Sequence, residues 1–216
     1  MITSEAEARA WVANLPQASD AAMARLDRLA ALLAEENSQQ NLVSAASLDA
    51  VWQRHIADSA QLLLHVSHET GGPWLDLGTG AGFPGLVIAC LLPETEIVMV
   101  ESRRRRIDWL GRVVDSFGLA QAKVIGTRLE LVPTHQFSVI SARAFAPLGK
   151  LLDLSARFST STTSWLLPKG RSAAHELAEL AGWHHAFHVE QSLTDPEGGI
   201  IVGAVSGKAA KRGRKP

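Results

Sequence analysis

The sequence contains one cysteine, Cys90, among 216 residues. Disulfide scaffolds and thiolate metal centres both need several cysteines, so both are excluded. Cys90 lies in an apolar run and is predicted to be a buried structural thiol. Of the histidines, His184, His185 and His188 lie together, but they are interleaved with apolar residues, as on the exposed edge of a strand. We therefore predict no metal.

Long apolar runs are also missing, because none reaches the roughly 20 residues that cross a bilayer. The first residues carry Glu5 and Glu7 instead of the basic start of a secretory signal. We expect a soluble, cytoplasmic protein with no membrane contact. With 46% hydrophobic residues, the chain can bury the core of one main domain.

A strong net charge is absent too: the formal value is −1, which disfavours a general polyanion binder. Residues 208–216 nevertheless carry five Lys or Arg and no acid, which leaves −6 for the rest of the chain. We predict a disordered basic tail over 207–216 that suits an RNA or DNA phosphate backbone. A solubilising terminus without a role is the alternative.

The chain does contain a glycine turn between a strand pattern and a helix pattern. An apolar run ends near Asp76, Gly78, Gly80 and Gly82 follow at alternate positions, and an apolar helical pattern covers 86–92. Glycine is needed where φ is positive or where backbone N–H groups must approach a ligand closely. The turn is interpreted as the floor of a nucleotide-like pocket, with a glycine turn made only for helix–sheet packing as the alternative.

The spacing of the turn discriminates between nucleotides. A P-loop needs Lys and then Ser or Thr after its last glycine, whereas residues 85–87 are Gly-Leu-Val. A dinucleotide fingerprint needs glycine where Phe83 stands. The pattern suits S-adenosylmethionine, which has no pyrophosphate. Glu101 ends the next strand, 23 residues beyond Gly78, where a carboxylate can accept hydrogen bonds from both ribose hydroxyls of NAD or S-adenosylmethionine.

The hydrophobic periodicity divides the chain into a helical extension over 1–70 and an α/β domain over 71–206. In the second part strands alternate with helices, which predicts a mostly parallel, doubly wound sheet. After the strand at 74–77, further strands are expected at 97–100, 122–126, 137–140 and 163–167, with a closing hairpin of 184–189 and 199–205.

Charged residues on two predicted helices leave alternatives open. Arg54 and Asp58 are four residues apart, so they form either an ion pair on a solvated face or part of a lid against the cofactor pocket. The four arginines at 103–106 open another helix. Successive residues fan around a helix by about 100° each, so only one or two of these arginines can face RNA.

The segment after the fourth strand narrows the chemistry. Methylation of an exocyclic amine commonly uses an Asp/Asn-Pro-Pro-aromatic turn there, whereas residues 141–144 are Ser-Ala-Arg-Ala. Methylation at pyrimidine carbon 5 needs a cysteine nucleophile, and Cys90 is placed elsewhere. A nucleophilic acceptor such as guanine N7 remains, and it needs positioning but no general base. Arg143, Arg128 and Lys169 are the candidates to hold phosphate or guanine O6.

Five segments carry a resemblance to a known family. They are 41–42 (Asn-Leu), 54–59 (Arg-His-Ile-Ala-Asp-Ser), 75–85 around the glycine turn, 141–146 (Ser-Ala-Arg-Ala-Phe-Ala) and 169–170 (Lys-Gly). These segments occur in the same order as in the bacterial glucose-inhibited division protein B family, the small-subunit ribosomal RNA guanine-N7 methyltransferases G, and the chain resembles this family. The resemblance implies a class I methyltransferase fold, S-adenosylmethionine as cofactor, and a guanine in the 530 loop of 16S rRNA, at position 527, as target. It also implies 30S subunits or an assembly intermediate as partner, and we expect a monomer.

The resemblance also adds cofactor contacts at Gly78, Phe83, Arg143 and the pair 129–130. The full predicted set is Asp76, Gly78, Gly80, Gly82, Phe83, Glu101, Ser102, Leu129, Glu130 and Arg143. The chain departs from the family where Glu101 replaces the usual Asp, and where Glu36 and Gln40 occupy a segment that usually holds Trp and Tyr.

Two other functions remain open at this level. A small-molecule methyltransferase explains the glycine turn and Glu101, but it leaves Arg128, Arg143 and Lys169 as incidental charges. A non-catalytic binder, associated with ribosomes or sensing NAD, keeps the pocket without turnover. Methyl transfer that falls steeply with salt is expected of an RNA enzyme and would count against the small-molecule methyltransferase. Protection from unfolding by NAD, with none by S-adenosylmethionine, would identify the NAD-sensing binder.

Overall fold

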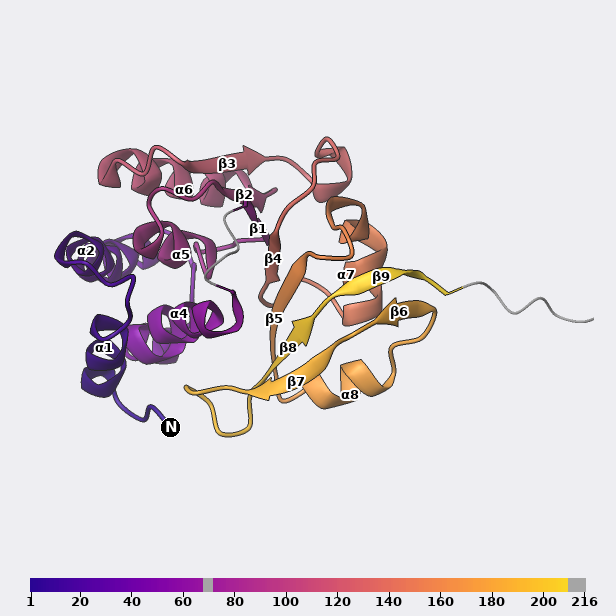
Figure 1. The fold of residues 1–216 in the computed structure, drawn as a ribbon. Helices are drawn as coiled ribbons and strands as arrows, with labels where there is room; N and C mark the ends of the chain where they lie inside the picture. The colour runs from indigo at the N-terminus through magenta and orange to yellow at the C-terminus, as the bar shows by residue number, and fades with distance from the viewer. Residues whose placement is uncertain (68–71, 210–216) are drawn as a thin grey trace, which may run out of the picture.

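A computed structural model of the protein describes residues 1–67 and 72–209, and its centre is a seven-stranded sheet with the order β3-β2-β1-β4-β5-β8-β7 (Figure 1). Strands β1 to β5 run parallel, whereas β8 pairs antiparallel with β5 and β7. The predicted mostly parallel sheet is confirmed. The strands are β1 Trp74–Leu77, β2 Ile97–Glu101, β3 Ala122–Gly126, β4 Val139–Ala142, β5 Ser164–Gly170, β6 Trp183–His185, β7 His188–Gln191, β8 Gly199–Gly203 and β9 Val205–Lys208.

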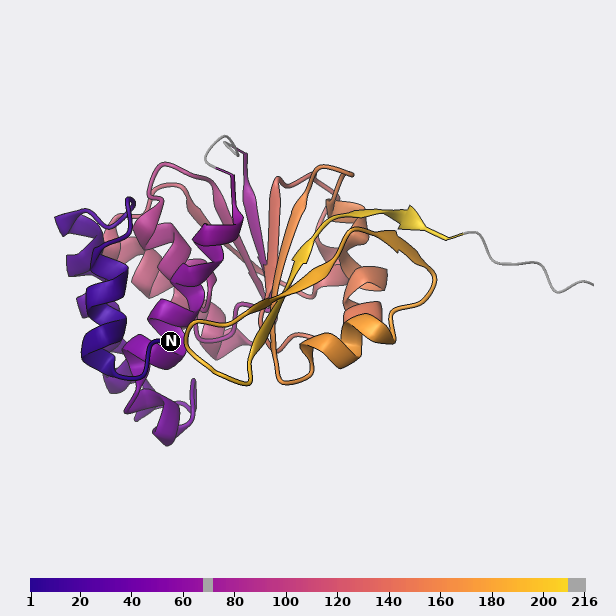
Figure 2. The ribbon, with the colours of Figure 1, turned by 60° about the horizontal axis from the view of Figure 1, so that its bottom comes forward.

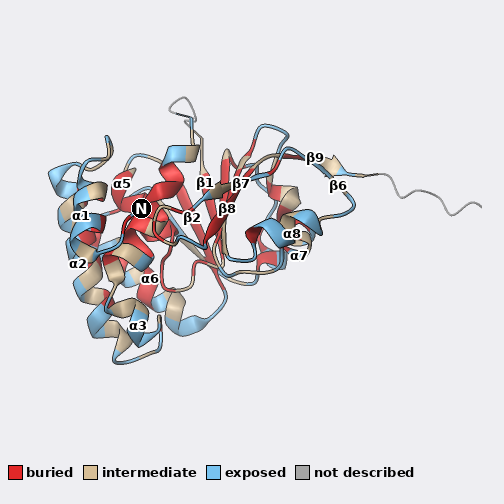
Figure 3. Ribbon diagram, turned by 90° about the horizontal axis from the view of Figure 1, so that it is seen from below, coloured by how far each residue is buried: buried red, intermediate tan, exposed pale blue. Residues whose placement is uncertain are grey.

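Helices cover both faces of the sheet, as Figures 1 and 2 show from two directions. They are α1 Glu5–Ala13, α2 Asp20–Asn37, α3 Ala45–Leu48, the π-helix η1 Trp52–Ala57, α4 Asp58–Ala60, η2 Gln61–His65, α5 Gly85–Leu91, α6 Arg104–Phe117, η3 Leu129–Leu131, α7 Leu148–Ser155, η4 Ala156–Phe158 and α8 Ala173–Ala178. Alternate strand residues point to opposite faces, so Trp74 packs with α1 to α6, whereas Leu75 packs with α7 and α8. Buried residues follow the strands and the inner sides of the helices (Figure 3).

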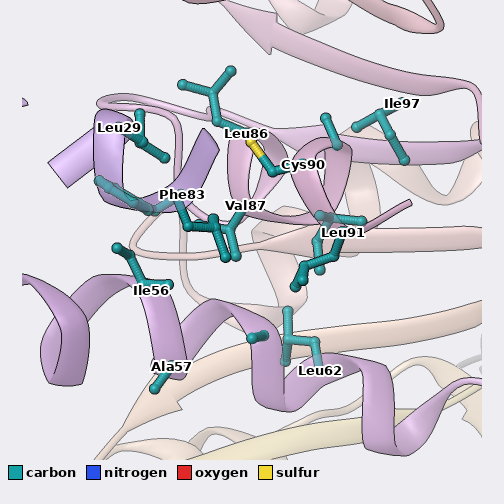
Figure 4. Packing of buried hydrophobic residues seen from close by; sticks show 14 of the residues in the cluster. Leu29, Ile56, Ala57, Leu62, Phe83, Leu86, Val87, Cys90, Leu91 and Ile97 are labelled. Carbon is teal, nitrogen blue, oxygen red and sulfur yellow. The ribbon is translucent and has the colours of Figure 1, made fainter. Parts of the chain in front are cut away.

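The N-terminal helices share a hydrophobic cluster with one face of the sheet. Leu29 of α2, Ile56 of η1 and Leu86 of α5 are fully buried in it (Figure 4). Cys90 lies in the same cluster, and burial raises the pKa of its thiol to about 12. The prediction of a buried structural thiol is confirmed. The division of the chain at residue 70 falls within residues 68–71, outside the described residues, and stays a prediction.

The closing part of the sheet differs from the predicted single hairpin. Only β7 and β8 join the main sheet, whereas β6 and β9 form a separate two-stranded ribbon. Gly203 explains the break, because its φ is 145° and an added Cβ would lie 2.4 Å from the carbonyl oxygen of Ala186. Of the predicted tail, Lys208 belongs to β9 and pairs with Asp153 at 2.8 Å, and residues 210–216 lie outside the described part.

Candidate cofactor and substrate site

The glycine turn after β1 has the backbone that its sequence predicts. Gly78, Gly80 and Gly82 have φ values of 64°, 63° and 110°. A Cβ at Gly78 would lie 2.5 Å from a ring carbon of Phe145, and one at Gly82 would lie 2.3 Å from a methyl group of Leu86. The turn therefore serves helix–sheet packing at Gly82 and borders a cavity at Gly78. The packing role that the sequence suggested for the turn thus applies to Gly82, and the role as a pocket floor applies to Gly78.

Asp76 lies beneath this turn and is fully buried. One carboxylate oxygen accepts the backbone N–H of Gly85 at 3.0 Å, and the other accepts the hydroxyl of Ser141 at 2.7 Å. Burial raises the pKa of Asp76 above its usual value, while these hydrogen bonds act in the opposite direction. Sequence reasoning placed Asp76 among the cofactor contacts. The structure places its side chain where it fixes the turn and α5, and its predicted contact with the cofactor stays a prediction.

Glu101 connects the end of β2 to the turn. One carboxylate oxygen accepts the N–H groups of Ser102 at 2.7 Å and Arg103 at 2.8 Å, and the other accepts the N–H of Gly80 at 3.1 Å. The guanidinium of Arg106 lies 3.8 Å away. A carboxylate has about four acceptor positions, so three N–H donors leave one for a ribose hydroxyl, where the sequence predicted room for both hydroxyls.

A cavity of about 390 Å³ opens beside these residues and gathers much of the predicted cofactor set. Its lining includes Gly78, Glu101, Ser102, Leu129 and Glu130, which come from the last residue of β2 and from the segments after β1, β2 and β3. Its volume lies within the range of small-molecule sites. The glycine cradle, the free acceptor position of Glu101 and the volume all fit an adenosine-containing cofactor.

A second cavity of about 580 Å³ adjoins the first. Arg54, Asp58, Arg143 and Lys169 are among its lining residues. Residues 144–145 line both cavities, so this short segment separates them. Within it Ala144 has a φ of 52°, a left-handed conformation that non-glycine residues rarely adopt and that gathers at functional sites.

Arg143 projects from the end of β4 and is held by three groups. Its guanidinium donates to the carboxylate of Asp58 at 3.2 Å, the backbone carbonyl of Arg54 at 3.1 Å, and Nδ1 of His55 at 3.0 Å. It also lies over the ring of Phe83, 5.3 Å from the ring centre. Phe83 was predicted as a cofactor contact. The structure buries it outside the lining of both cavities, where it supports Arg143 and stacks on His55 at 4.8 Å.

His55 is neutral in this arrangement. Because an arginine only donates hydrogen bonds, Nδ1 of His55 accepts, and the ring proton is on Nε2. Burial, followed by the charges of Arg143 and Arg54, lowers the pKa of His55 to about 3. Its Nε2 is buried and has no hydrogen-bond partner among the described residues. His55 therefore orients Arg143 as an acceptor and does not compete with it as a cation.

This neutral histidine predicts an acid-dependent loss of stability. In the unfolded chain His55 titrates near pH 6.5, whereas in the folded chain its pKa is about 3. Below pH 6.5 the unfolded state thus binds a proton that the folded state does not, and stability falls as the pH falls. Between pH 7.5 and 5.0 the wild type should lose about 2 kcal/mol more than His55→Asn in urea unfolding. Equal losses in the two proteins would show that folding does not lower the pKa of His55.

Lys169 lies on the same cavity as Arg143, whereas Arg128 lies on the other. The ammonium of Lys169 is buried, and it binds the carboxylate of Glu176 at 2.8 Å and the carbonyl of Ala146 at 2.5 Å. Lys169 therefore shapes the second cavity as half of an ion pair. Arg128 lines the first cavity instead, because it follows β3, three strands away from β4. Of the three predicted substrate-positioning residues, the structure places Arg143 and Lys169 on one cavity and Arg128 on the other.

Arg54 and Asp58 both line the second cavity and do not pair with each other on a solvated face. The predicted ion pair between them is not formed: Arg54 pairs with Asp195 at 3.4 Å, and Asp58 pairs with Arg143. Residues 52–57 form a π-helix, whose wider turns remove the register that brings residues four apart together. His55 and Asp58 were missed as individual site residues. For Asp58 the sequence offered only a place in a lid together with Arg54, and for His55 the signal was its presence in segment 54–59, which carries the family resemblance.

Two other kinds of feature are absent from the described residues. Within residues 1–67 and 72–209, no group of three His, Cys, Asp or Glu side chains is arranged to hold a metal ion. In the same residues, no helix combines the length and the apolar character needed to cross a membrane.

The fold is that of S-adenosylmethionine-dependent methyltransferases. The structure is similar to that of such a methyltransferase from Aquifex aeolicus, with a TM-score of 0.54 and 15% identity, over 68% of this chain and 89% of that one. It is also similar to a mutant of MtNAS in complex with S-adenosylmethionine, with a TM-score of 0.55 and 13% identity, over 94% and 77% of the two chains.

Sequence comparison gives the family. Residues 22–194 match the GidB family, described as rRNA small subunit methyltransferase G, and the chain belongs to this family. Curated relatives of that name come from Erythrobacter litoralis, 59% identical over 94% of this chain and 97% of the relative, and from Novosphingobium aromaticivorans, 56% identical over 94% and 89%. The cofactor is S-adenosylmethionine, as the sequence predicted.

Proposed function

We propose that this protein transfers a methyl group from S-adenosylmethionine to N7 of a guanine in 16S rRNA, at position 527 in the 530 loop. Membership of the small-subunit rRNA methyltransferase G family supports the substrate class. The observation that carries the chemistry is the guanidinium of Arg143, fixed on the wall of a cavity that adjoins the cofactor cavity.

The groups around Arg143 favour an acceptor that needs no deprotonation. His55 is neutral, and its Nδ1 is occupied by Arg143. The carboxylate of Asp58 accepts from Arg143, Thr194 and Gln61, and Lys169 is paired with Glu176. Guanine N7 already carries a lone pair. When bound, S-adenosylmethionine supplies an electrophilic methyl group, so the chain has to orient the base and exclude water.

Each predicted residue has a proposed part in this site. Gly78, Gly80 and the pair 129–130 form the cofactor cradle, Glu101 and the backbone of Ser102 hold the ribose side, and Asp76, Gly82 and Phe83 support the cradle from beneath. Arg143 positions the guanine through its O6 edge or a neighbouring phosphate. Lys169 and Glu176 line the same cavity as Arg143 and form an ion pair, and Arg128 acts at the cofactor cavity.

The cellular setting is part of the same proposal. The enzyme acts as a monomer in the cytoplasm, on the 30S subunit or an assembly intermediate, without membrane contact. The helices before residue 70 form one wall of the substrate cavity through η1 and α4. The basic tail adds affinity for RNA through its charge.

The decisive test is methyl transfer to 30S subunits from a strain that lacks the modification. Labelled S-adenosylmethionine should give label in 16S rRNA, and borohydride and aniline treatment should cleave the chain at one guanine of the 530 loop. Labelling without this cleavage would contradict N7 chemistry. No labelling of 30S or 16S RNA, despite cofactor binding, would favour the small-molecule methyltransferase, and thermal protection by NAD alone would favour the non-catalytic binder.

A further inference from the structure

Three basic side chains differ from the other Lys and Arg side chains of the described residues because they have no interaction partner there. Nearly all of its Lys and Arg side chains contact a carboxylate, a backbone carbonyl or an aromatic ring, as Arg9 does with Asp27. Arg103, Arg128 and Lys150 have no such partner among residues 1–67 and 72–209, and all three are exposed. They are available to an external anion without breaking an internal contact.

These three residues lie at the same edge of the sheet. Arg103 follows β2, Arg128 follows β3, and Lys150 lies in the first turn of α7, after β4. Because β2, β1 and β4 are parallel neighbours and β3 pairs with β2, their carboxyl ends meet at one edge. Helix α7 also packs against η3, which directly follows Arg128.

Two of the three, Arg103 and Arg128, line the cofactor cavity itself. The acids of that cavity only partly offset them. Glu101 is occupied by three N–H groups and lies near Arg106, which leaves the exposed Glu130 as the acid without a partner among the described residues. The mouth of the cavity is thus cationic.

We propose that Arg103, Arg128 and Lys150 form a phosphate-binding rim, and that the RNA backbone held by this rim crosses the mouth of the cofactor cavity. The inference rests on the proposed function, in which the target base enters the adjoining cavity beside Arg143. A base can enter that cavity only from an unpaired or unstacked nucleotide, so the strand at the rim is a loop. RNA bound in this way covers the cofactor, which enters before the RNA and leaves after it.

The first test compares two double variants that each remove two positive charges. Arg103→Gln with Arg128→Gln changes the rim. Arg9→Gln with Lys123→Gln changes two surface ion pairs, on α1 and near the start of β3, at residues that do not line the cofactor cavity. Binding to a 16S rRNA fragment with the 530 loop is measured over a range of salt, with S-adenosylhomocysteine present. The rim variant should bind at least about tenfold more weakly, with a log–log salt slope smaller by about 1 to 2. Equal affinities and slopes in the two variants would overturn the proposal.

Lys150→Gln provides an independent test in case the substitutions in the double rim variant distort the cofactor cavity. Lys150 does not line that cavity, so its replacement should leave cofactor affinity unchanged and lower the salt slope by about 0.7 to 0.9. An unchanged slope in this variant would remove Lys150 from the rim and contradict the proposal.

The second test follows dissociation of S-adenosylhomocysteine from the wild type. Bound RNA should slow it at least tenfold, and the rim variant should lose most of this effect. Equal dissociation rates with and without RNA would show that the strand does not cross the mouth. Neither test requires methyl transfer, so failure of the 30S labelling experiment with rim-dependent RNA binding intact would reject the proposed function and leave the rim in place.

Discussion

Arg143→Ala should reduce kcat/KM for methyl transfer by about 100-fold or more, a loss of roughly 3 kcal/mol of transition-state stabilisation. The reason is the fixed geometry of the guanidinium, which Asp58, His55 and the carbonyl of Arg54 hold beside the cofactor cavity. Radioactive transfer to 16S rRNA measures the effect. The family resemblance implies a cofactor contact at Arg143, but Arg143 lines the second cavity and not the first, so cofactor affinity should change much less.

Two further variants make this prediction specific. Arg143→Lys keeps the charge but loses the planar fork, so it should recover little activity. Arg171→Ala removes an exposed arginine paired with Glu197 and should stay within about twofold of the wild type. Full activity of Arg143→Ala, or full rescue by lysine, would contradict the positioning role. Circular dichroism and the melting temperature establish that each variant folds.

Asp76→Ala is the substitution expected to cost the most stability. It leaves the backbone N–H of Gly85 and the hydroxyl of Ser141 without their acceptor in a fully buried place. We expect a loss of about 3 to 4 kcal/mol. For a chain of this size the melting temperature should fall by roughly 6–15 °C.

A matched variant separates burial from charge. Asp27→Ala also removes an aspartate that accepts two hydrogen bonds, but its partner is the exposed Arg9, so it should lose less than about 1 kcal/mol. Cofactor affinity should fall in Asp76→Ala, because the glycine turn loses its support, and it should be unchanged in Asp27→Ala. Equal melting temperatures for the two variants would show that Asp76 does not hold the turn.

Much of the fold was predictable because its signals are local. The third strand was predicted at 122–126 and is found there, and the glycine turn follows β1 as expected. The fourth strand, predicted at 137–140, covers Val139–Ala142, since strand ends depend on pairing with neighbours. The split of the closing hairpin was not predicted, because it depends on the contact of Gly203 with the backbone of Ala186, 17 residues away.

The sequence predicted which residues gather at the cofactor cavity better than it predicted what each side chain does there. Gly78, Glu101, Ser102, Leu129 and Glu130 meet at one cavity, because the carboxyl ends of parallel strands share an edge. Their individual contacts remain predictions. Whether a side chain faces a cavity or lies beneath it depends on packing in three dimensions, and that was not readable from spacing.

The sequence by itself determined the alternation of strands and helices, the glycine turn and the acid at the end of β2, because hydrophobic period and glycine placement act over a few residues. Only the tertiary structure decided the partners of the charged groups. Asp58 pairs with Arg143, 85 residues further along the chain, and Lys169 with Glu176, while Arg128 lies three strands away from Arg143. A guanidinium or ammonium group binds the nearest well-placed acceptor, and the folded backbone sets which acceptor that is.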